Sequence, residues 1–353
     1  MLDASAVRCY ACPLLTALAF VFPGQGSQTV GMGRDVYETS AAARAIFDEA
    51  DRVLGYKLSE LCFDGPAERL NDTTVAQPAV LATSIALFEA MVETVTQKLG
   101  RRVTDGSEPR GVMALPEYMR PSFVAGHSLG EFTALVTAGV LPFSDALRLV
   151  AERGQLASTR GARGAMAAIV GLSAQDVERV IADTVESGTV VVANDNGPMQ
   201  VTIAGSDAGI RAVTEALEQR GAKKIVPLRI SAPFHFPDMG RIGPDLRAFM
   251  QTLRFREPVV PIVANVSALP HPSATAIQEA LVRHLSNRVE WLKSVRYMVE
   301  RGASTFVEIG AGQVVNGLVK RIADVKLVNV SDTGSIAGAL RTLGERAHSV
   351  IAR

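Results

Sequence analysis

The segment at residues 124–131, Val-Ala-Gly-His-Ser-Leu-Gly-Glu, constrains the fold more than any other part of this chain. It contains Gly-x-Ser-x-Gly centred on Ser128, with an apolar run before it and a run of helical spacing after it. A serine between a strand and a helix lies on a sharp turn, where a side chain at Gly126 or Gly130 would crowd the backbone. The free N–H groups of the helix start can stabilise an oxyanion. The motif predicts a nucleophilic serine, although a chain with 30 glycines also produces this pattern by chance.

Length and charge exclude several classes of protein. With 353 residues the chain can bury a large core and form two lobes. Its 36 basic and 36 acidic residues balance, so nothing in bulk predicts binding to nucleic acid or to a charged membrane. No run approaches the roughly 20 apolar residues of a membrane span. The apolar run at 14–22 lacks a signal-peptide cleavage site and is better explained as a buried first strand, so we expect a cytoplasmic protein.

The three cysteines, Cys9, Cys12 and Cys62, argue against a disulfide scaffold. Cys9-x-x-Cys12 could be half of a metal site or a redox pair. Because no second cysteine pair exists and the motif lies near an irregular terminus, we expect neither.

Strands alternate with helices along most of the chain, which predicts an α/β fold with a mostly parallel sheet covered by helices on both faces. The expected strands cover residues 18–22, 123–125, 260–266 and 305–309. The expected helices cover residues 41–54, 80–99, 131–138, 145–158, 244–253, 275–285, 291–300 and 313–322. Ser144 is the expected cap of the helix at 145–158, and residues 101–121 are expected to form a surface loop.

The order of elements changes between residues 164 and 230. The expected order is strand 165–170, helix 173–186 capped by Ser173, strands 190–194 and 200–204 joined by a turn at 195–198, helix 207–220 and strand 224–230. This β-α-β-β-α-β order is that of a ferredoxin-like unit. We therefore expect three parts: an N-terminal extension (1–17), a large α/β-hydrolase-like subdomain (18–163 and 231–353) and an inserted small ferredoxin-like subdomain (164–230).

A nucleophilic serine needs a base. The chain offers five histidines: His127, His235, His271, His284 and His348. His235 follows a predicted strand and a proline turn, which places it at the sheet edge where α/β enzymes keep working residues. His127 adjoins Ser128, but a neighbour on the turn usually points elsewhere. Position favours His235 as the base and leaves open a loop histidine that caps backbone groups.

Four motifs in order resemble malonyl-CoA:acyl carrier protein transacylases, the acyltransferases that load fatty acid and polyketide synthases. They are Phe-Pro-Gly-Gln-Gly-Ser-Gln at 22–28, Gly-His-Ser-Leu-Gly-Glu at 126–131, Pro-Phe-His at 233–235 and Val-Glu-Ile-Gly at 307–310. The resemblance covers about residues 18–330.

The resemblance implies a role for each matching residue. Ser128 is the nucleophile and His235 its base, while the Gln25 side chain and the Leu129 N–H hold the oxyanion. Arg153 grips the free malonyl carboxylate, for which its guanidinium fork is well suited. Without the resemblance, Arg153 would be interpreted as a surface residue of a helix.

The resemblance also implies residues around the acyl group. The backbone carbonyl of His284 orients the catalytic histidine. Four residues are expected in the substrate pocket: His127, Phe234, Asn194 and Asn196. Phe234 favours a malonyl over a methylmalonyl group. The chain departs from the family's common residues at His284, Phe236, Asp238 and Ala311, and the resemblance implies that such positions line the acyl or pantetheine channel.

The implied partners are malonyl-CoA and a phosphopantetheinylated acyl carrier protein. No metal or other cofactor is needed, because one thioester is exchanged for another, and we expect a monomer that binds neither nucleic acid nor membrane. An acidic carrier would meet basic residues near the site, and the candidates are Arg220, Lys223, Lys224, Arg229, Arg283, Arg288, Lys293 and Arg296. Two alternatives stay open: a serine hydrolase or proofreading thioesterase acting on carrier proteins, and a non-enzymatic docking module of a synthase. Fatty acid and polyketide synthesis are equally compatible.

Overall fold

The central element of the fold is a five-stranded parallel sheet, described here from a computed structural model of residues 17–100, 111–228, 230 and 232–351. Its strands are β1 (Ala17–Phe22), β2 (Phe123–Gly126), β7 (Ile262–Val263), β8 (Ala303–Ile309) and β9 (Lys326–Val330). Their order is β7-β2-β1-β8-β9, and every neighbouring pair is parallel. The carboxyl ends of β1, β2 and β7 therefore meet at one edge, where ligand sites form in such sheets.

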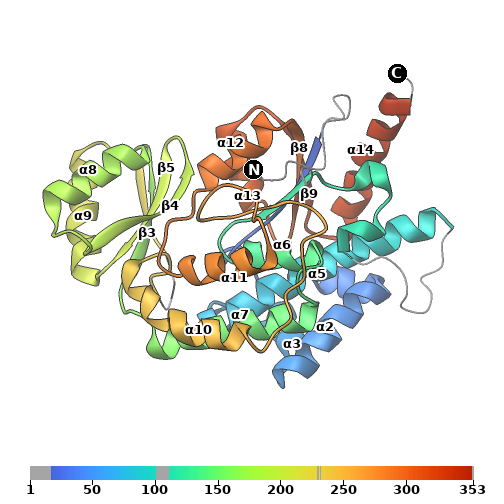
Figure 1. The fold of residues 1–353 in the computed structure, drawn as a ribbon, viewed down its shortest axis with the longest axis horizontal. Helices are drawn as coiled ribbons and strands as arrows, with labels where there is room; N and C mark the ends of the chain where they lie inside the picture. Colours follow the sequence, from blue (N-terminus) through green and yellow to red (C-terminus); the bar gives the residue numbers. More distant parts are fainter. Residues whose placement is uncertain (1–16, 101–110, 229, 231, 352–353) are drawn as a thin grey trace, which may run out of the picture.

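Helices cover both faces of this sheet (Figure 1). Phe20 and Phe22 of β1 join the larger core with α2 (Ala41–Leu54), α5 (Thr73–Lys98), α6 (Gly130–Thr137), α7 (Phe143–Arg160) and α14 (Thr333–Ile351). Ala19 and Val21 point to the other core, with α12 (Trp291–Glu300) and α13 (Val314–Ile322). Successive side chains of a strand point to opposite faces, so a strand buried on both faces is apolar throughout. The predicted α/β architecture is confirmed.

A second, four-stranded sheet lies beside the first (Figure 1). It contains β3 (Ala165–Val170), β4 (Val190–Gly197), β5 (Gln200–Gly205) and β6 (Lys224–Pro227), all antiparallel in the order β4-β5-β3-β6. Apolar residues of α8 (Ala174–Thr184) and α9 (Asp207–Gln219) pack with those of the strands in one core. The predicted β-α-β-β-α-β order is confirmed; the subdomain boundaries after residues 163 and 230 stay predictions.

Several predicted boundaries are wrong. The expected turn at 195–198 starts too early, because β4 continues to Gly197 through two irregularities of register. Strand β6 ends at Pro227 rather than 230, and β7 covers two residues rather than 260–266. Helix α7 begins at Phe143 after Pro142, so Ser144 lies inside it, whereas the Ser173 side chain caps α8 as expected.

Helix α5 contradicts two expectations. It begins at Thr73, where the Asp72 side chain accepts from Thr74 N–H, and it contains Pro78, which we expected to precede the helix. By length and composition α5 could cross a membrane, so the expectation that no run approaches a span is wrong. Its most apolar window is 94% buried inside the protein, as in a core helix.

The remaining described elements are short or were not expected. Strand β9 and helix α14 were not predicted, and the loop at 101–121 contains two 3₁₀ helices in its described part. The first of them begins at residue 111. Residues 101–110, Cys9 and Cys12 lie outside the described chain, as does the predicted N-terminal extension up to residue 16. Ala17, the last residue of that predicted extension, belongs to β1. The other elements are α1 (Arg34–Thr39), α3 (Leu58–Asp64), α4 (Ala67–Leu70), η1 (Gly111–Ala114), η2 (Glu117–Met119), η3 (Pro237–Ile242), α10 (Gly243–Met250) and α11 (Ala274–Arg283).

Candidate active site

Ser128 lies on the turn between β2 and α6 with a left-handed backbone, φ 51°. The two flanking glycines are required by close backbone approaches. A Cβ at Gly126 would lie 1.8 Å from the carbonyl carbon of Gly130, and a Cβ at Gly130 would lie 2.2 Å from the oxygen of Phe22. The strand–turn–helix geometry expected from the motif is therefore present, and it exposes Ser128 at the edge where the strands end.

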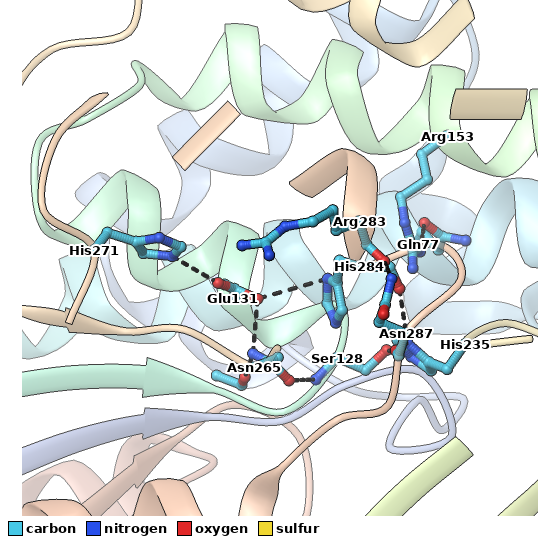
Figure 2. Close-up of polar contacts among 11 residues, drawn as sticks. Gln77, Ser128, Glu131, Arg153, His235, Asn265, His271, Arg283, His284 and Asn287 are labelled. Carbon is cyan, nitrogen blue, oxygen red and sulfur yellow. Dashed lines mark hydrogen bonds and ion pairs between the residues drawn. The ribbon is translucent and has the colours of Figure 1, made fainter. Parts of the chain in front are cut away.

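His235 faces Ser128, as the hypothesis of a Ser–His pair requires (Figure 2). Its Nε2 lies 2.8 Å from Ser128 Oγ, and its Nδ1 lies 2.8 Å from the His284 carbonyl oxygen and 3.2 Å from that of Asn287. A carbonyl only accepts, so Nδ1 carries the hydrogen and Nε2 is free to accept the serine proton. His235 also has a left-handed backbone, φ 62°. Such strained residues cluster at functional sites.

Arg153 of α7 is only 2% exposed, so the interpretation as a surface residue is wrong. Its Nη1 donates to Gln77 Oε1 at 2.6 Å, and its guanidinium carbon lies 4.1 Å from the Phe234 ring centroid. Nε and Nη2 have no hydrogen-bond partner among the described residues. Burial lowers the pKa of Arg153 to about 9, opposed by the charge of Glu131. A buried cation with unpaired donors is costly unless an anion joins it.

The expected oxyanion donors occupy separate positions. Gln25 follows β1, and its Nε2 donates to Thr73 Oγ1 at 3.1 Å. Leu129 precedes the first residue of α6, and within the described chain its N–H makes no hydrogen bond. That N–H is therefore available to an acyl oxygen, and its role and that of Gln25 stay predictions.

The remaining pocket candidates connect the turn at Ser128 to the small sheet. His127 Nε2 lies 2.6 Å from Asn196 Oδ1, and its ring packs edge-on against Trp291, with centroids 5.5 Å apart. Asn196 also donates to Thr202 Oγ1 at 3.2 Å. Asn194 is buried on the same strand, where its backbone bridges to Val289. The hydrogen bond between His127 and Asn196 places β4 next to the turn at Ser128. Contact of these residues with an acyl group stays a prediction.

Sequence reasoning missed four polar residues that contact the Ser–His pair directly or through one another: Glu131, Asn265, His271 and Asn287. Only Glu131 lay within a recognised motif, and Asn265 was hidden inside a predicted strand. Of the family departures, Asp238 is exposed beside Arg241, at 3.6 Å, whereas Phe236 and Ala311 are buried. Among the described residues no group of His, Cys, Asp or Glu is arranged to hold a metal ion.

Three imidazoles around Ser128 favour the neutral form: those of His235 and His284, which are buried, and that of His127, which is half-buried. Burial, followed by the charges of Arg153 and His127, lowers the pKa of His235 to about 3. Burial and the neighbouring positive groups hold the pKa of His284 well below its usual value, even though Glu131 Oε2 lies 3.5 Å from its Nδ1. Burial also lowers the pKa of His127. Below pH 6.5 these histidines are therefore protonated in the unfolded chain and stay neutral in the native protein.

We expect the free energy of unfolding to fall as the pH drops below 6.5, by up to about 1.4 kcal/mol per pH unit for each of these histidines. Glu308 opposes this trend, because burial raises its pKa to about 7 and the folded state gains its proton first. Urea unfolding of the wild type and His284→Gln at pH 6.5 and 5 isolates one contribution, since the variant retains the carbonyl. If the free energy of unfolding fell by the same amount between pH 6.5 and pH 5 in both proteins, the lowered pKa of His284 would be contradicted.

Comparisons with known proteins agree with this geometry. The acyl transferase domain family matches residues 19–98 and 115–340. Malonyl CoA-acyl carrier protein transacylase of Bacillus subtilis is 39% identical over 335 residues, covering 94% of this chain and 98% of its own. The crystal structure of acyl-carrier-protein-S-malonyltransferase from Bartonella henselae matches with TM-score 0.83 and 38% identity over 93% of this chain and 99% of its own.

A third match is a solved complex of a type II PKS acyl-carrier protein with its malonyl-transacylase. It has TM-score 0.81 and 38% identity, over 92% of this chain and 99% of that one. The sequence motifs, the fold and the site geometry thus all point to the same family, and the matches cover nearly the whole length of the chain. The chain belongs to the acyl transferase domain family, among the malonyl CoA-acyl carrier protein transacylases.

Proposed function

We propose that this acyltransferase moves a malonyl group from malonyl-CoA to the phosphopantetheine thiol of an acyl carrier protein through a malonyl-Ser128 intermediate. The observation that carries the proposal is the buried guanidinium of Arg153, with two nitrogens unpaired among the described residues, in the same site as the Ser128–His235 pair. A carboxylate at the far end of the acyl group satisfies those donors with charge-assisted hydrogen bonds, each contributing roughly 1.5–3 kcal/mol.

The reaction takes place in two exchanges. His235 Nε2 accepts the proton of Ser128 Oγ, which attacks the thioester carbon, and the Leu129 N–H and Gln25 hold the oxyanion. The carbon–sulfur bond breaks, and coenzyme A leaves with the proton from His235. The carrier thiol then enters, loses its proton to His235 and takes the malonyl group, which restores Ser128. One thioester replaces another, so we propose no metal, redox or nucleotide cofactor.

The charge of the substrate also supports the base. Arg153 is one of the groups that lower the pKa of His235 in the free protein. A malonyl carboxylate paired with Arg153 offsets that positive charge, so His235 becomes a stronger base when the correct substrate is bound. A neutral acyl group leaves Arg153 uncompensated and His235 weakly basic. This coupling favours malonyl over acetyl thioesters in the chemical step as well as in binding.

A hydrolase or proofreading thioesterase is the second candidate, because the Ser–His pair alone permits it. The Nδ1 of His235 meets two carbonyls rather than a carboxylate, which gives orientation with less stabilisation of the imidazolium. We propose that this arrangement suits transfer to a thiol, with β4 and the small sheet limiting access of water to the acyl-serine.

Incubating the protein with radiolabelled malonyl-CoA and holo carrier protein tests the proposal. We expect malonyl carrier protein and free coenzyme A in equal amounts, with little free malonate. Free malonate without malonyl carrier would establish the hydrolase instead. A docking module of a synthase has no use for catalytic chemistry, so it would be supported if His235→Ala had no functional consequence.

The carrier protein is expected to meet basic residues near the site. Of the candidates, Arg220, Arg288 and Lys293 already pair with Asp183, Glu178 and Glu290. Arg283 is exposed next to His284, and none of the ion pairs among the described residues involves it. We propose Arg283 as part of the docking surface, and we place the protein in the cytoplasm as a monomer acting in fatty acid or polyketide synthesis. Arg229 lies outside the described residues.

A further inference from the structure

The side chain of Asn265 bridges the two sides of the turn at Ser128. Asn265 is 2% exposed and follows β7, the neighbour of β2 in the sheet. Its Oδ1 accepts from the Ser128 N–H at 2.8 Å, and its Nδ2 donates to the Gly126 carbonyl at 2.7 Å (Figure 2). One amide thus holds the peptide groups on both sides of the residue before the serine.

Glu131 determines the orientation of that amide. It is 1% exposed, and its Oε2 accepts from Asn265 Nδ2 at 2.8 Å. A flipped amide would place Oδ1 against the Gly126 carbonyl and the Glu131 carboxylate, both of which only accept. His271 Nε2, 2.8 Å from Glu131 Oε1, holds the other carboxylate oxygen. Glu131 is therefore fixed from two sides and has no ion pair with Lys or Arg among the described residues.

The bridge has two consequences for Ser128. It stabilises a left-handed backbone that a residue with a side chain adopts only at a cost. It also decides which N–H faces the acyl oxygen. Because Asn265 binds the Ser128 N–H, the Leu129 N–H is the neighbouring donor left without a partner in the described chain. Losing the bridge would change both the position of Oγ and the geometry of the oxyanion donors.

We infer that Asn265 and Glu131 are positioning residues for acyl transfer, which hold Ser128 in its reactive geometry, with His271 anchoring Glu131. The inference rests on the proposed role of Ser128. It assigns neither residue a contact with substrate: Asn265 and Glu131 position Oγ for attack, whereas Arg153 recognises the malonyl group.

The test is single-turnover acylation of Ser128 by malonyl-CoA, followed by quenching and intact-protein mass spectrometry. We expect Asn265→Ala and Asn265→Asp to slow acylation by about 100-fold, while affinity for malonyl-CoA stays within about threefold. Asp fails because it offers no donor to Gly126 or Glu131. Glu131→Gln is expected within about fivefold of wild type, because its amide oxygen still accepts from Asn265, whereas Glu131→Ala falls by at least about tenfold.

Asn329→Ala is the matched control, an asparagine in β9 whose side chain has no hydrogen-bond partner among the described residues. It should acylate at the wild-type rate. If the wild type shows no malonyl on Ser128, the proposed site fails. If the wild type is acylated and the Asn265 variants match it within about threefold, the positioning role is overturned. Should those variants fail to unfold cooperatively, the Glu131 pair decides: equal rates for Gln and Ala overturn the role, and rescue by Gln supports it.

Discussion

Replacing Ser128 by alanine is expected to abolish the malonyl-enzyme and to lower kcat/KM for transfer by at least about 10⁴-fold, as in other enzymes that lose a serine nucleophile. Without Oγ, the Nε2 of His235 has no proton to accept at 2.8 Å and no covalent intermediate forms. Arg153 is untouched, so binding of malonyl-CoA should persist. The measurements are intact mass after incubation with malonyl-CoA, transfer to holo carrier protein, and calorimetric affinity.

Two variants complete this experiment. His235→Ala should reduce the rate by about 10²–10⁴-fold, the usual contribution of a positioned base. Ser122→Ala is the matched control, because Ser122 is exposed just before β2 and should leave transfer unchanged. A covalent malonyl adduct on Ser128→Ala would contradict the assignment of the nucleophile.

Replacing Arg153 by alanine is expected to change selectivity more than any other substitution. Two lost charge-assisted hydrogen bonds, at roughly 1.5–3 kcal/mol each, predict a fall of about 10²–10⁴-fold in kcat/KM for malonyl-CoA. The kcat/KM for acetyl-CoA should change little, because an acetyl group has no carboxylate. The ratio of kcat/KM for malonyl-CoA to that for acetyl-CoA should therefore fall by the same factor. Comparing kcat/KM for the two thioesters measures it.

The thermal stability of Arg153→Ala should not fall, even though its activity does. In the free protein Arg153 is a buried cation with one hydrogen bond to Gln77 and two nitrogens unpaired among the described residues. An unpaired buried charge is costly to the folded state, so thermal unfolding of Arg153→Ala should occur at or above the wild-type temperature. Arg153→Lys keeps the charge but loses the planar fork and should be intermediate in selectivity. An unchanged malonyl-to-acetyl ratio in Arg153→Ala would remove Arg153 from the acyl site.

Local features of the sequence were enough to predict the turn at Ser128. Gly126 and Gly130 are needed because backbone atoms lie 1.8 Å and 2.2 Å from where a Cβ would stand. That steric requirement falls on neighbouring residues, so it is visible in the sequence as the Gly-x-Ser-x-Gly motif. The β-α-β-β-α-β order of residues 165–227 was equally accessible, because each element has its own apolar periodicity and Ser173 is a local cap.

Boundaries failed where tertiary packing overrode a local signal. Pro78 normally disrupts a helix, yet α5 contains it, because the helix is capped at Asp72 and buried along most of its length. The predicted strand at 260–266 contracts to two residues, since only Ile262 and Val263 pair with β2. The residues that follow bend away and bring Asn265 to the turn at Ser128.

By itself, the sequence determined which residue is the nucleophile candidate, which fold surrounds it and, through resemblance, which arginine meets the substrate. Only the tertiary structure decided that Arg153 is buried with unpaired donors, that the Asn287 carbonyl joins that of His284 at His235, and that Glu131, Asn265 and His271 support the serine. The reason is physical. Motifs record the steric needs of neighbouring residues, whereas hydrogen bonds between residues more than 130 positions apart depend on which strand ends the sheet order brings together.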